Sequence, residues 1–588
     1  MKTLIFLVLL LFVVYSNSFS QSQWNFQSGT GIVVEAGADI CADSVIINGT
    51  FSGTGTICGY QDVEPIPPFL STPASNNLNI VPVVIIRYLP TTDGISLDPN
   101  VTGINSTLAA MKSKIDIMDK QIKFSLEEGS KFRGYSNSNA RPTLGYKVVY
   151  YVTVYENIPR SNFQVPWNPS AYRPDYDAIL NRFNVQYFVE QLGVREFWIW
   201  GYHHGDIEPV ESNMSSALTG DISNSERRND DLPIYNKTYV LYNYNYDRSQ
   251  AEAVHNHGHQ LEAILNYINN RQSGNTVLFW NKFVGNENNV HVTGRCGWTH
   301  MPPNTTFDYD YQNYNTVQSD IEDWTPDKTG QLKYVNASTW GNINYVWPSN
   351  VIPSQQIESH WYIYWFQNMP GFGNMIKYSG SYYMTNWWKF TANWDTCIIT
   401  NTGLFGQPKS LQLTALVQGF YDPVTNKMIK DTVTVYLRNS SSPYAIIDSS
   451  KNKTDSTGKT TLIFWNSLSG SNKYIIIKHR NSIETWSATG QSFTDSISYY
   501  NFSNILTQAY GNNMIQVDNS PMRFAVYSGD VNQDGFVNLT DITKVYNDAT
   551  NFITGYVPSD INGDGIVTLT DLLNTYNNSS GFVSISRP

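Results

Sequence analysis

The chain has few cysteines and no cluster of basic residues. Four cysteines among 588 residues are too few for a disulfide scaffold, although an oxidising compartment would allow Cys41 to pair with Cys58 and Cys296 with Cys397. The formal net charge is −11, from 38 Lys and Arg against 49 Asp and Glu. Because contacts to a phosphate backbone need clustered Lys and Arg, this composition argues against a nucleic-acid partner.

Long apolar runs are also scarce. The run at 4–14 follows Lys2 and precedes Ser18-Phe19-Ser20, which is the arrangement of a secretory signal peptide over 1–20. It is shorter than the ~20 residues that span a bilayer as a helix. We therefore expect a secreted or surface-associated protein without a membrane span. No Gly-x-Ser-x-Gly elbow, phosphate loop or dinucleotide fingerprint occurs, so serine esterase, NTPase and NAD-dependent activities have no support.

The length and the hydrophobic content of 41% indicate several folded domains. Strand-like and helix-like segments alternate at 78–268, which predicts an α/β core with a mostly parallel sheet. Short strands with Asn, Ser and Gly turns follow and predict an all-β, immunoglobulin-like sandwich. We expect a β-rich N-terminal segment and linker at 21–65, the α/β core at 66–402, the sandwich at 403–527 and a small α module at 528–588.

Two twelve-residue loops near the C-terminus, 530–541 and 560–571, have the pattern of calcium-binding loops. Each has Asp, Asn and Asp at loop positions 1, 3 and 5, Gly at position 6 and Asp at position 12. A second copy of the pattern makes a chance match remote. We expect two Ca²⁺ sites with ligands from Asp530, Asn532, Asp534, Phe536, Asp541, Asp560, Asn562, Asp564, Ile566 and Asp571.

A short helix-like segment follows each calcium loop and ends in Tyr-Asn, and neither loop has a helix before it. This duplicated loop-helix unit resembles a type I dockerin. The resemblance implies attachment to a cohesin-like or surface scaffold. Together with the segments 431–440 and 478–487, the unit is similar to the C-terminal block of secreted proteins of Bacteroidetes and Ignavibacteria, which implies export or attachment rather than catalysis.

Three of the nine histidines lie within five residues of one another. On a helix, His255, His259 and Glu262 share one face, and the two histidines have the i, i+4 spacing with which imidazoles bind zinc. We expect these three residues to form a zinc site, with His257 pointing elsewhere; the alternative is a buried polar stripe. Asn256 stands where zinc proteases of the HExxH type have a general-base Glu, which argues against ordinary metalloprotease chemistry.

A second set of candidate residues consists of carboxylates near aromatic side chains. One of them follows a buried strand-like segment at 196–202, a position where α/β folds bind ligands. Glycoside hydrolysis requires two carboxylates that flank the scissile bond, and the 16 Trp and 39 Tyr offer flat faces for sugar rings. The alternative roles are structural turns and calcium ligands. The expected catalytic residues are Glu211, Asp308, Asp310, Glu322 and Asp323.

The segments 259–262, 300–304 and 308–310 resemble an exported bacterial family. The resemblance implies that they form one site and names no reaction. We expect a secreted modular hydrolase of an extracellular polymer, with the O-glycosyl bonds of a polysaccharide as the favoured target. One alternative is a zinc-dependent peptidase or amidase centred on the histidine site. The other is a non-catalytic glycan-binding or cell-surface protein.

Overall fold

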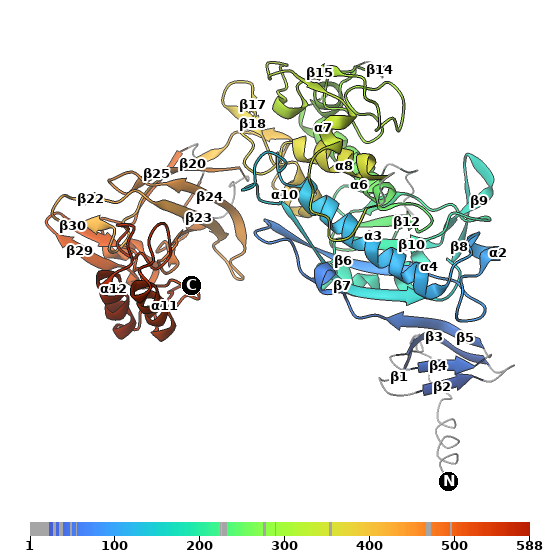
Figure 1. Ribbon diagram of the computed structural model, residues 1–588, viewed down its shortest axis with the longest axis horizontal. Coiled ribbons are helices and arrows are strands. Elements are labelled where there is room, and N and C mark those ends of the chain that lie inside the picture. Colours follow the sequence, from blue (N-terminus) through green and yellow to red (C-terminus); the bar gives the residue numbers. More distant parts are fainter. Residues whose placement is uncertain are drawn as a thin grey trace, which may run out of the picture. The chain divides into compact units, whose positions relative to one another are not determined.

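The computed structural model describes residues 23–26, 31–34, 39–47, 50–53, 56–223, 225, 232–273, 278–287, 290–351, 355–465, 472–493 and 497–588. The expected signal peptide lies outside these residues. The chain forms two compact units (Figure 1). Unit 1 comprises Met1–Gly373 and Trp387–Thr396, and unit 2 comprises Asn374–Asn386 and Cys397–Pro588.

Unit 1 is built on one eight-stranded mixed sheet. Its strands are β1 (Gln23–Phe26), β3 (Asp39–Ile47), β5 (Thr56–Val63), β6 (Asn79–Tyr88), β7 (Leu144–Val154), β10 (Glu196–Gly201), β11 (Ser212–Ser215) and β12 (Tyr239–Asn245), in the spatial order β1-β3-β5-β7-β6-β10-β12-β11. The four central strands pair in parallel, whereas β5 with β7 and β11 with β12 pair antiparallel. The sheet is therefore mostly parallel, as the alternation of strands and helices predicts.

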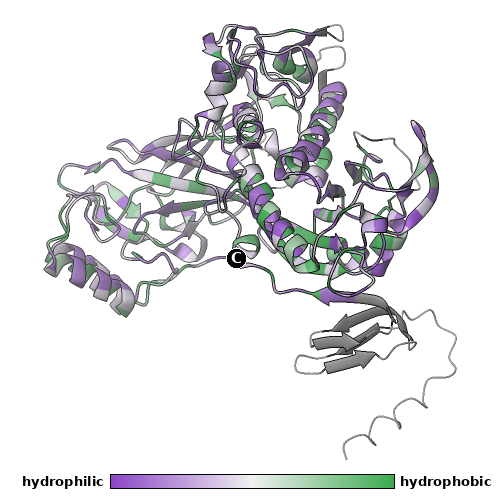
Figure 2. Cartoon of the chain, turned by 45° about the vertical axis from the view of Figure 1, so that its right-hand side comes forward, coloured by the Kyte–Doolittle hydropathy of each residue, from purple (hydrophilic) through white to green (hydrophobic). Residues whose placement is uncertain are grey.

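The central strands are apolar along their whole length. Every residue of β10 is buried, and β6 is fully buried from Val83 onward. Strands covered by other elements on both faces appear in the sequence as continuous hydrophobic runs, which is why a segment such as 196–202 could be recognised as strand-like. Figure 2 shows hydrophobic residues on these strands and on parts of the helices beside them.

The N-terminal strands are part of the core sheet. β5 pairs with β7, with Gln61 opposite Val154, and β3 pairs in parallel with β5. The expected boundary between an N-terminal segment and the core at residue 65 therefore does not separate two sheets. Cys41 and Cys58 are register partners on β3 and β5, and their side chains lie outside the described part of the chain.

Three long helices of unit 1 pack against one another: α3 (Leu108–Gly129), α6 (Gln250–Ser273) and α8 (Gln356–Asn368). α8 is buried on all sides from Ser359 to its end, so its sequence has no polar stripe to mark it. Its sequence therefore lacks the apolar and polar alternation by which a surface helix is recognised. Among the helices that the structure describes, no helix combines the length and the apolar character required to cross a bilayer.

Unit 1 has several shorter elements. The segment 176–190 forms two short helices and not one, because Asn184 adopts a left-handed conformation with φ of 49°. Its shorter helices include α1 (Pro68–Ser71), α2 (Pro99–Thr102), α4 (Tyr176–Arg182), α5 (Val185–Glu190), a π-helix (Leu278–Val284), α7 (Ala337–Gly341) and α9 (Trp388–Ala392). Its two-stranded ribbons pair β2 (Gly31–Val34) with β4 (Thr50–Gly53), β8 (Arg160–Val165) with β9 (Asn168–Pro174), β13 (Asn286–Glu287) with β14 (Val290–His291), and β15 (Val317–Ser319) with β16 (Lys333–Val335). A further helix, α10, spans Trp394–Ile399.

Unit 2 contains a sandwich of two sheets around one hydrophobic core. One sheet has the order β25-β20-β28 and the other β24-β23-β26-β27. These strands are β20 (Lys409–Thr414), β23 (Thr432–Asn439), β24 (Ile446–Lys453), β25 (Lys459–Phe464), β26 (Lys473–His479), β27 (Thr485–Trp486) and β28 (Ile497–Asn501). Both sheets contribute alternate residues to the core, among them Leu411, Leu413, Val433, Val435 and Ile475. The result matches the all-β domain expected from the short strands.

The two calcium loops lead into α11 (Leu539–Thr550) and α12 (Leu569–Ser580), which pack against each other around a small core. Figure 1 shows the two helices side by side. This module packs on the sandwich through hydrogen bonds: Asn481 Nδ2 donates to the carbonyl of Asp560 at 2.9 Å, and Asn578 Nδ2 donates to Gln418 Oε1 at 2.6 Å. The sandwich and the helical module, expected as two domains, belong to one compact unit.

Candidate metal centre

Three histidines of unit 1 converge on one point. His255 and His259 lie one turn apart on α6, and His300 lies in the loop after β14. One ring nitrogen from each of the three lies within 4.8 Å of the others, and the Nε2 atoms of His259 and His300 are 2.9 Å apart. Among the described residues, this is the group of His, Cys, Asp or Glu ligand atoms with the geometry of a metal site.

Glu262 holds His259 in position. Its Oε2 accepts a hydrogen bond from His259 Nδ1 at 2.8 Å, and its Oε1 accepts from the backbone N–H of Thr299 at 2.9 Å and from Thr299 Oγ1 at 2.5 Å. Both carboxylate oxygens are thus engaged away from the point where the histidines meet. Glu262 is therefore placed to orient His259, and the ring nitrogens that converge are those of His255, His259 and His300.

A hydrogen-bond chain fixes the proton on His255. Tyr311 Oη donates to the carbonyl of Thr299 at 3.1 Å, which commits its proton. Tyr362 Oη, 2.8 Å from Tyr311 Oη, must then donate to it, and His255 Nδ1, 3.1 Å from Tyr362 Oη, must carry a proton and donate in turn. The proton of the neutral ring therefore lies on Nδ1, and the lone pair on Nε2 is left for a ligand.

The contact between His259 and His300 requires a proton or a metal ion between the two ring nitrogens. His259 uses its Nδ1–H for Glu262, and His300 directs its Nδ1 toward Asp308 Oδ1 at 3.4 Å. When both rings are neutral with the proton on Nδ1, two lone pairs face each other at 2.9 Å. Such a contact is repulsive unless a proton or a metal ion lies between the two nitrogens. Imidazoles with partners on Nδ1 and converging Nε2 atoms are the donor set of a zinc-type site.

The pKa values of the three rings differ. Burial, and then the neighbouring His259 and His300, lower the pKa of His255 to about 2. Burial and His259 also lower the pKa of His300. Burial alone would lower the pKa of His259, but the carboxylate of Glu262 outweighs it and raises that pKa. His255 and His300 are thus held neutral at pH 7, the form in which histidine binds a metal ion.

The neighbouring residues of α6 explain why the helix lies where it does. Asn256 Nδ2 donates to the carbonyls of Asn243 at 2.7 Å and Glu211 at 3.3 Å, which joins α6 to β12 and to the start of β11. His257 lies on another face of the helix, as expected, with Nε2 2.6 Å from Tyr244 Oη. Asn256 therefore has a structural role here.

Glu211 lies near the histidines. It directly precedes β11, its side chain is partly exposed, and its charge acts on both His259 and Tyr309. Of the five carboxylates expected to be catalytic, Glu211 and Asp308 are the two whose charges act on the histidine site.

The other three expected carboxylates are engaged in different contacts. Asp310 accepts hydrogen bonds from Asn313 and Thr305 within its own turn. Glu322 contacts Lys333 Nζ at 2.6 Å and Tyr364 Oη at 3.1 Å. Asp323 accepts the N–H of Gln331 at 2.8 Å. These contacts support structural roles for the three residues, which is the alternative that the sequence left open.

The calcium loops have two nearly identical conformations. Asp530 Oδ2 accepts the N–H of Gly535 at 3.1 Å, and Asp541 Oδ1 accepts the N–H of Val531 at 2.9 Å. The second loop repeats these contacts with Asp560, Gly565, Ile561 and Asp571. Burial raises the pKa of Asp530 to about 6; the hydrogen bond from Gly535 opposes this rise, and the charges of Asp541 and Asp534 add to it. Buried acids held together in this way favour a bound cation.

Several residues of the metal centre were not expected from the sequence. His300 appeared there only among the segments with a family resemblance. The residues that fix the ring positions, Thr299, Tyr311 and Tyr362, carried no signal because they are distant in sequence. The two remaining cysteines, Cys296 and Cys397, are buried and are not joined by a disulfide in this structure.

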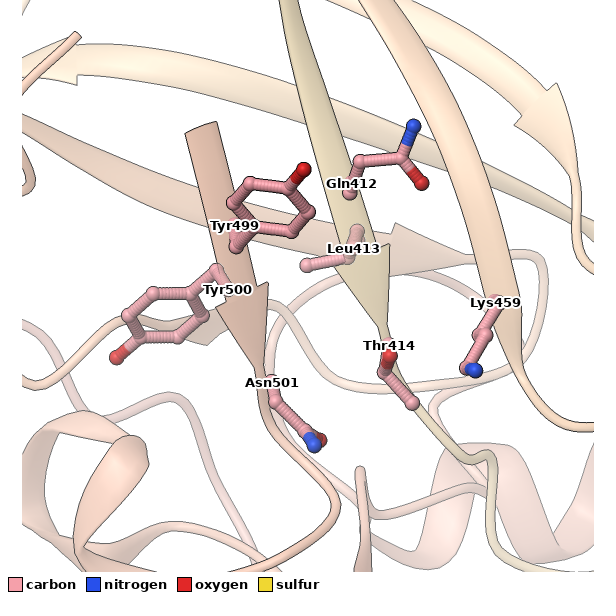
Figure 3. Close-up of a pocket in the computed structure, with 7 residues that line it drawn as sticks. All are labelled: Gln412, Leu413, Thr414, Lys459, Tyr499, Tyr500 and Asn501. Carbon is pink, nitrogen blue, oxygen red and sulfur yellow. The ribbon is translucent and has the colours of Figure 1, made fainter. Parts of the chain in front are cut away.

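Unit 2 has a shallow hollow on the β25-β20-β28 sheet (Figure 3). It has a volume of about 380 Å³ and lies beside Tyr499, whose side chain is 76% exposed. The polar side chains of Gln412, Thr414, Lys459 and Asn501 also line the hollow.

Comparison with protein-family models and with curated proteins finds no match. Among solved structures, the chain is similar to a C-terminal interface mutant and an N-terminal interface mutant of a type II cohesin–X–dockerin complex from Acetivibrio cellulolyticus. The identities are 17% and 15%; each match covers 30% of this chain and 100% of the other, with a TM-score of 0.18. A likeness at this TM-score carries no inference about the fold or the function of this chain.

Proposed function

We propose that unit 1 is a metal-dependent hydrolase that cleaves peptide or amide bonds, with His255, His259 and His300 as its metal ligands. The observation that carries the proposal is the convergence of one ring nitrogen from each of three histidines, with a partner at the Nδ1 atom of every ring. Catalytic zinc sites have three protein ligands and a fourth position for water or substrate. A zinc ion bound here would polarise a carbonyl group and lower the pKa of a bound water.

Glu211 is the residue proposed to accept the proton of the attacking water. The amide of Asn256 cannot do this, and its side chain is used for the carbonyls of Asn243 and Glu211. Glu211 directly precedes β11, and its charge acts on His259. The strand and the hydrogen bond from Asn256 of α6, the helix that carries two of the proposed ligands, hold Glu211 in position. The general base would thus come from the residue before a strand and not from α6, the helix that carries His255 and His259.

Metal content and turnover test this proposal together. The wild-type chain should contain one zinc ion, His300→Ala should contain none, and His257→Gln, which keeps an acceptor for Tyr244, should retain it. Glu211→Gln should retain the metal and cleave fluorescein-labelled casein about 10² times more slowly. Zinc retained in His300→Ala, or undiminished turnover in Glu211→Gln, would contradict the assignment.

The expectation of a polysaccharide-cleaving enzyme remains a second proposal with weaker support. Its best candidate, Glu211, belongs to the metal centre, and Asp310, Glu322 and Asp323 are engaged in other contacts. Release of reducing sugar from plant, algal or bacterial polysaccharides, abolished in Glu211→Gln with the metal still present, would favour it over the peptidase.

We propose a separate glycan-binding role for the hollow of unit 2. The exposed ring of Tyr499 offers a flat face on which a sugar ring stacks, and Gln412 and Asn501 offer amide groups to its hydroxyls (Figure 3). Affinity electrophoresis in gels that contain soluble polysaccharides tests this. Tyr499→Ala should lose any retardation, and equal mobility of mutant and wild type in every retarding gel would contradict the role.

The C-terminal module is proposed to attach the protein to a scaffold, as the dockerin resemblance implies. Equivalent positions of α11 and α12 carry exposed apolar residues: Leu539 and Leu569 are each 73% exposed, and Tyr546 and Tyr576 are also exposed. A small apolar hollow of about 220 Å³ lies beside Leu569. Repeated exposed apolar residues of this kind mark an interaction surface. Binding to a panel of cohesin domains, lost in the double variant Leu539→Asp and Leu569→Asp, would support the attachment role.

Two calcium ions and an extracellular location complete the proposal. The loop conformations and the buried acids support calcium binding, and extracellular calcium would keep such loops loaded. The export signal at 1–20 supports secretion or surface attachment.

A further inference from the structure

We propose that Tyr309 is the fourth protein ligand of the metal centre and that substrate displaces it. The inference rests on the metal-dependent function proposed above, and it assigns a group that the sequence patterns did not indicate. Tyr309 lies between two of the expected catalytic acids, Asp308 and Asp310, in the loop that follows His300.

The position of the Tyr309 hydroxyl is that of a neighbouring ligand on one ion. Tyr309 Oη is 3.1 Å from His300 Nε2, and His259 Nε2 is 2.9 Å from the same atom. Two ligand atoms, each ~2.1 Å from one ion and about 90–110° apart, are separated by roughly 3.0–3.4 Å. Because His300 Nε2 has one lone pair or one proton, it cannot satisfy both neighbours by hydrogen bonds, whereas one metal ion satisfies all three atoms.

The ring of Tyr309 is fixed against the ligands. It stacks on His255 with ring centroids 5.8 Å apart and an angle of 16°, and its centroid lies 4.4 Å from that of His300. Its backbone has φ of 63°, a left-handed conformation that is unfavourable for a bulky residue, and its N–H donates to the carbonyl of His300 at 2.9 Å. The loop therefore keeps an unfavourable conformation that places this ring over the histidines.

The Tyr309 side chain is also free of the constraints that hold the histidine ligands, so it is able to dissociate from the metal ion. Its side chain is 56% exposed, whereas His255 is buried and the two other histidine rings are largely so. The three histidine rings are held through Nδ1 by Tyr362, Glu262 and Asp308, and the Tyr309 hydroxyl has the contact to His300 Nε2. An exposed ligand on a loop exchanges more readily than a ligand on a buried helix. A substrate carbonyl would take its place on the ion, and the released phenolate, after it takes up a proton from solvent, would donate a hydrogen bond to that oxygen.

Copper(II) in place of zinc gives a test that does not depend on turnover. A tyrosine oxygen bound to copper(II) produces a visible charge-transfer absorption band that imidazole ligands do not. The full-length protein, Tyr309→Phe and the control Tyr314→Phe, an exposed tyrosine of the same loop, are each loaded with one equivalent of copper. Acetohydroxamate, a small amide analogue that chelates metals, is then added to each.

The wild type and Tyr314→Phe should show the band, Tyr309→Phe should bind one copper ion without it, and acetohydroxamate should remove it. A band of full intensity in Tyr309→Phe, or one that persists when the hydroxamate is bound, would overturn the assignment and leave the three-histidine hydrolase intact. A wild-type protein that binds no copper would overturn both. A protein that shows the band but cleaves no peptide would overturn only the proposed peptidase function.

Discussion

Gly258 of α6 lies directly against Thr299. A Cβ atom on Gly258 would be 2.7 Å from Thr299 Oγ1 and 3.1 Å from its Cγ2. Glycine within a helix is about 1 kcal/mol less stable than alanine, so Gly258 makes α6 less stable but allows Thr299 to lie close to the helix backbone. Thr299 donates its N–H and hydroxyl to Glu262, which orients His259, and its carbonyl accepts from Tyr311, which begins the hydrogen-bond chain to His255. The glycine thus makes room for a residue that helps to orient two of the three histidines.

Gly258→Ala should therefore weaken metal binding although alanine favours the helix. The added methyl group displaces Thr299, which loosens Glu262 and with it His259. Changes in such supporting contacts typically weaken metal affinity 10- to 100-fold. Competition with a chromophoric chelator measures the affinity. Gly341→Ala is the matched control, because its nearest neighbour, Ile357, is 3.5 Å away. Equal affinity in the two variants would show that Thr299 does not order the site.

Glu262→Gln separates a ligand from a residue that orients a ligand. If the carboxylate only orients His259, the amide keeps the shape and one acceptor, so the metal should remain bound with affinity lower by roughly 10- to 100-fold. The hydrogen bonds from Thr299 N and His259 Nδ1 to separate oxygens predict this outcome. His259→Ala, measured by the same chelator competition, should lose the metal altogether. Complete loss in both variants would restore Glu262 to the ligand set.

The sequence predicted the position of α6 and the face shared by His255, His259 and Glu262, but not the role of each residue. Helix geometry places Glu262 one turn from His259, and that same i, i+3 spacing lets its carboxylate bind Nδ1 of the ring. His300 is 41 residues from His259 in sequence, so no local spacing marks it as a ligand. A cluster of three histidines that draws on a helix and a distant loop is set by tertiary structure.

The fold shows the same division between local and tertiary causes. Central strands such as β10 were located because burial on both faces leaves a continuous apolar run. Burial on all sides made α8 harder to predict, because a helix without an exposed polar face lacks the 3.6-residue hydrophobic period that marks a helix in a sequence. The break at Asn184 depends on one left-handed residue, which periodicity does not reveal.

Asp431 makes the stability of unit 2 depend on pH. Burial alone would raise its pKa, but contacts from His479, the N–H of Thr432 and Tyr556 outweigh this and hold the pKa well below its usual range. Arg480 Nε also donates to it at 3.0 Å, and Arg480 Nη2 contacts Asp560 at 3.2 Å in the second calcium loop. Asp431 thus joins the sandwich to the helical module.

Asp431→Asn should lower the free energy of unfolding of unit 2 by about 1–3 kcal/mol at pH 7. Because the folded pKa lies below the unfolded value of about 3.9, this contribution is complete above pH ~4 and is lost as the pH falls further. Urea unfolding of the full chain at pH 7, 5, 4 and 3 measures it. The difference between mutant and wild type should be constant from pH 7 to 5 and shrink below 4, whereas a difference that stays constant down to pH 3 would exclude this carboxylate as its source.

Calcium should stabilise unit 2 through the loops that begin at Asp530 and Asp560. Both side chains are almost fully buried, and the charges of Asp534 and Asp541 act on Asp530, so an ion that binds the folded loops and not the unfolded chain raises stability by mass action. The gain is about 2.7 kcal/mol at a free calcium concentration 100 times the dissociation constant. Calorimetry of the full chain should show a higher midpoint for unit 2 with calcium than with chelator. Asp530→Asn should reduce that difference, while Asp422→Asn, in an exposed turn of the sandwich, should leave it unchanged. Equal midpoints with calcium and with chelator would show that the repeated loops bind no calcium under these conditions and act only as turns before α11 and α12.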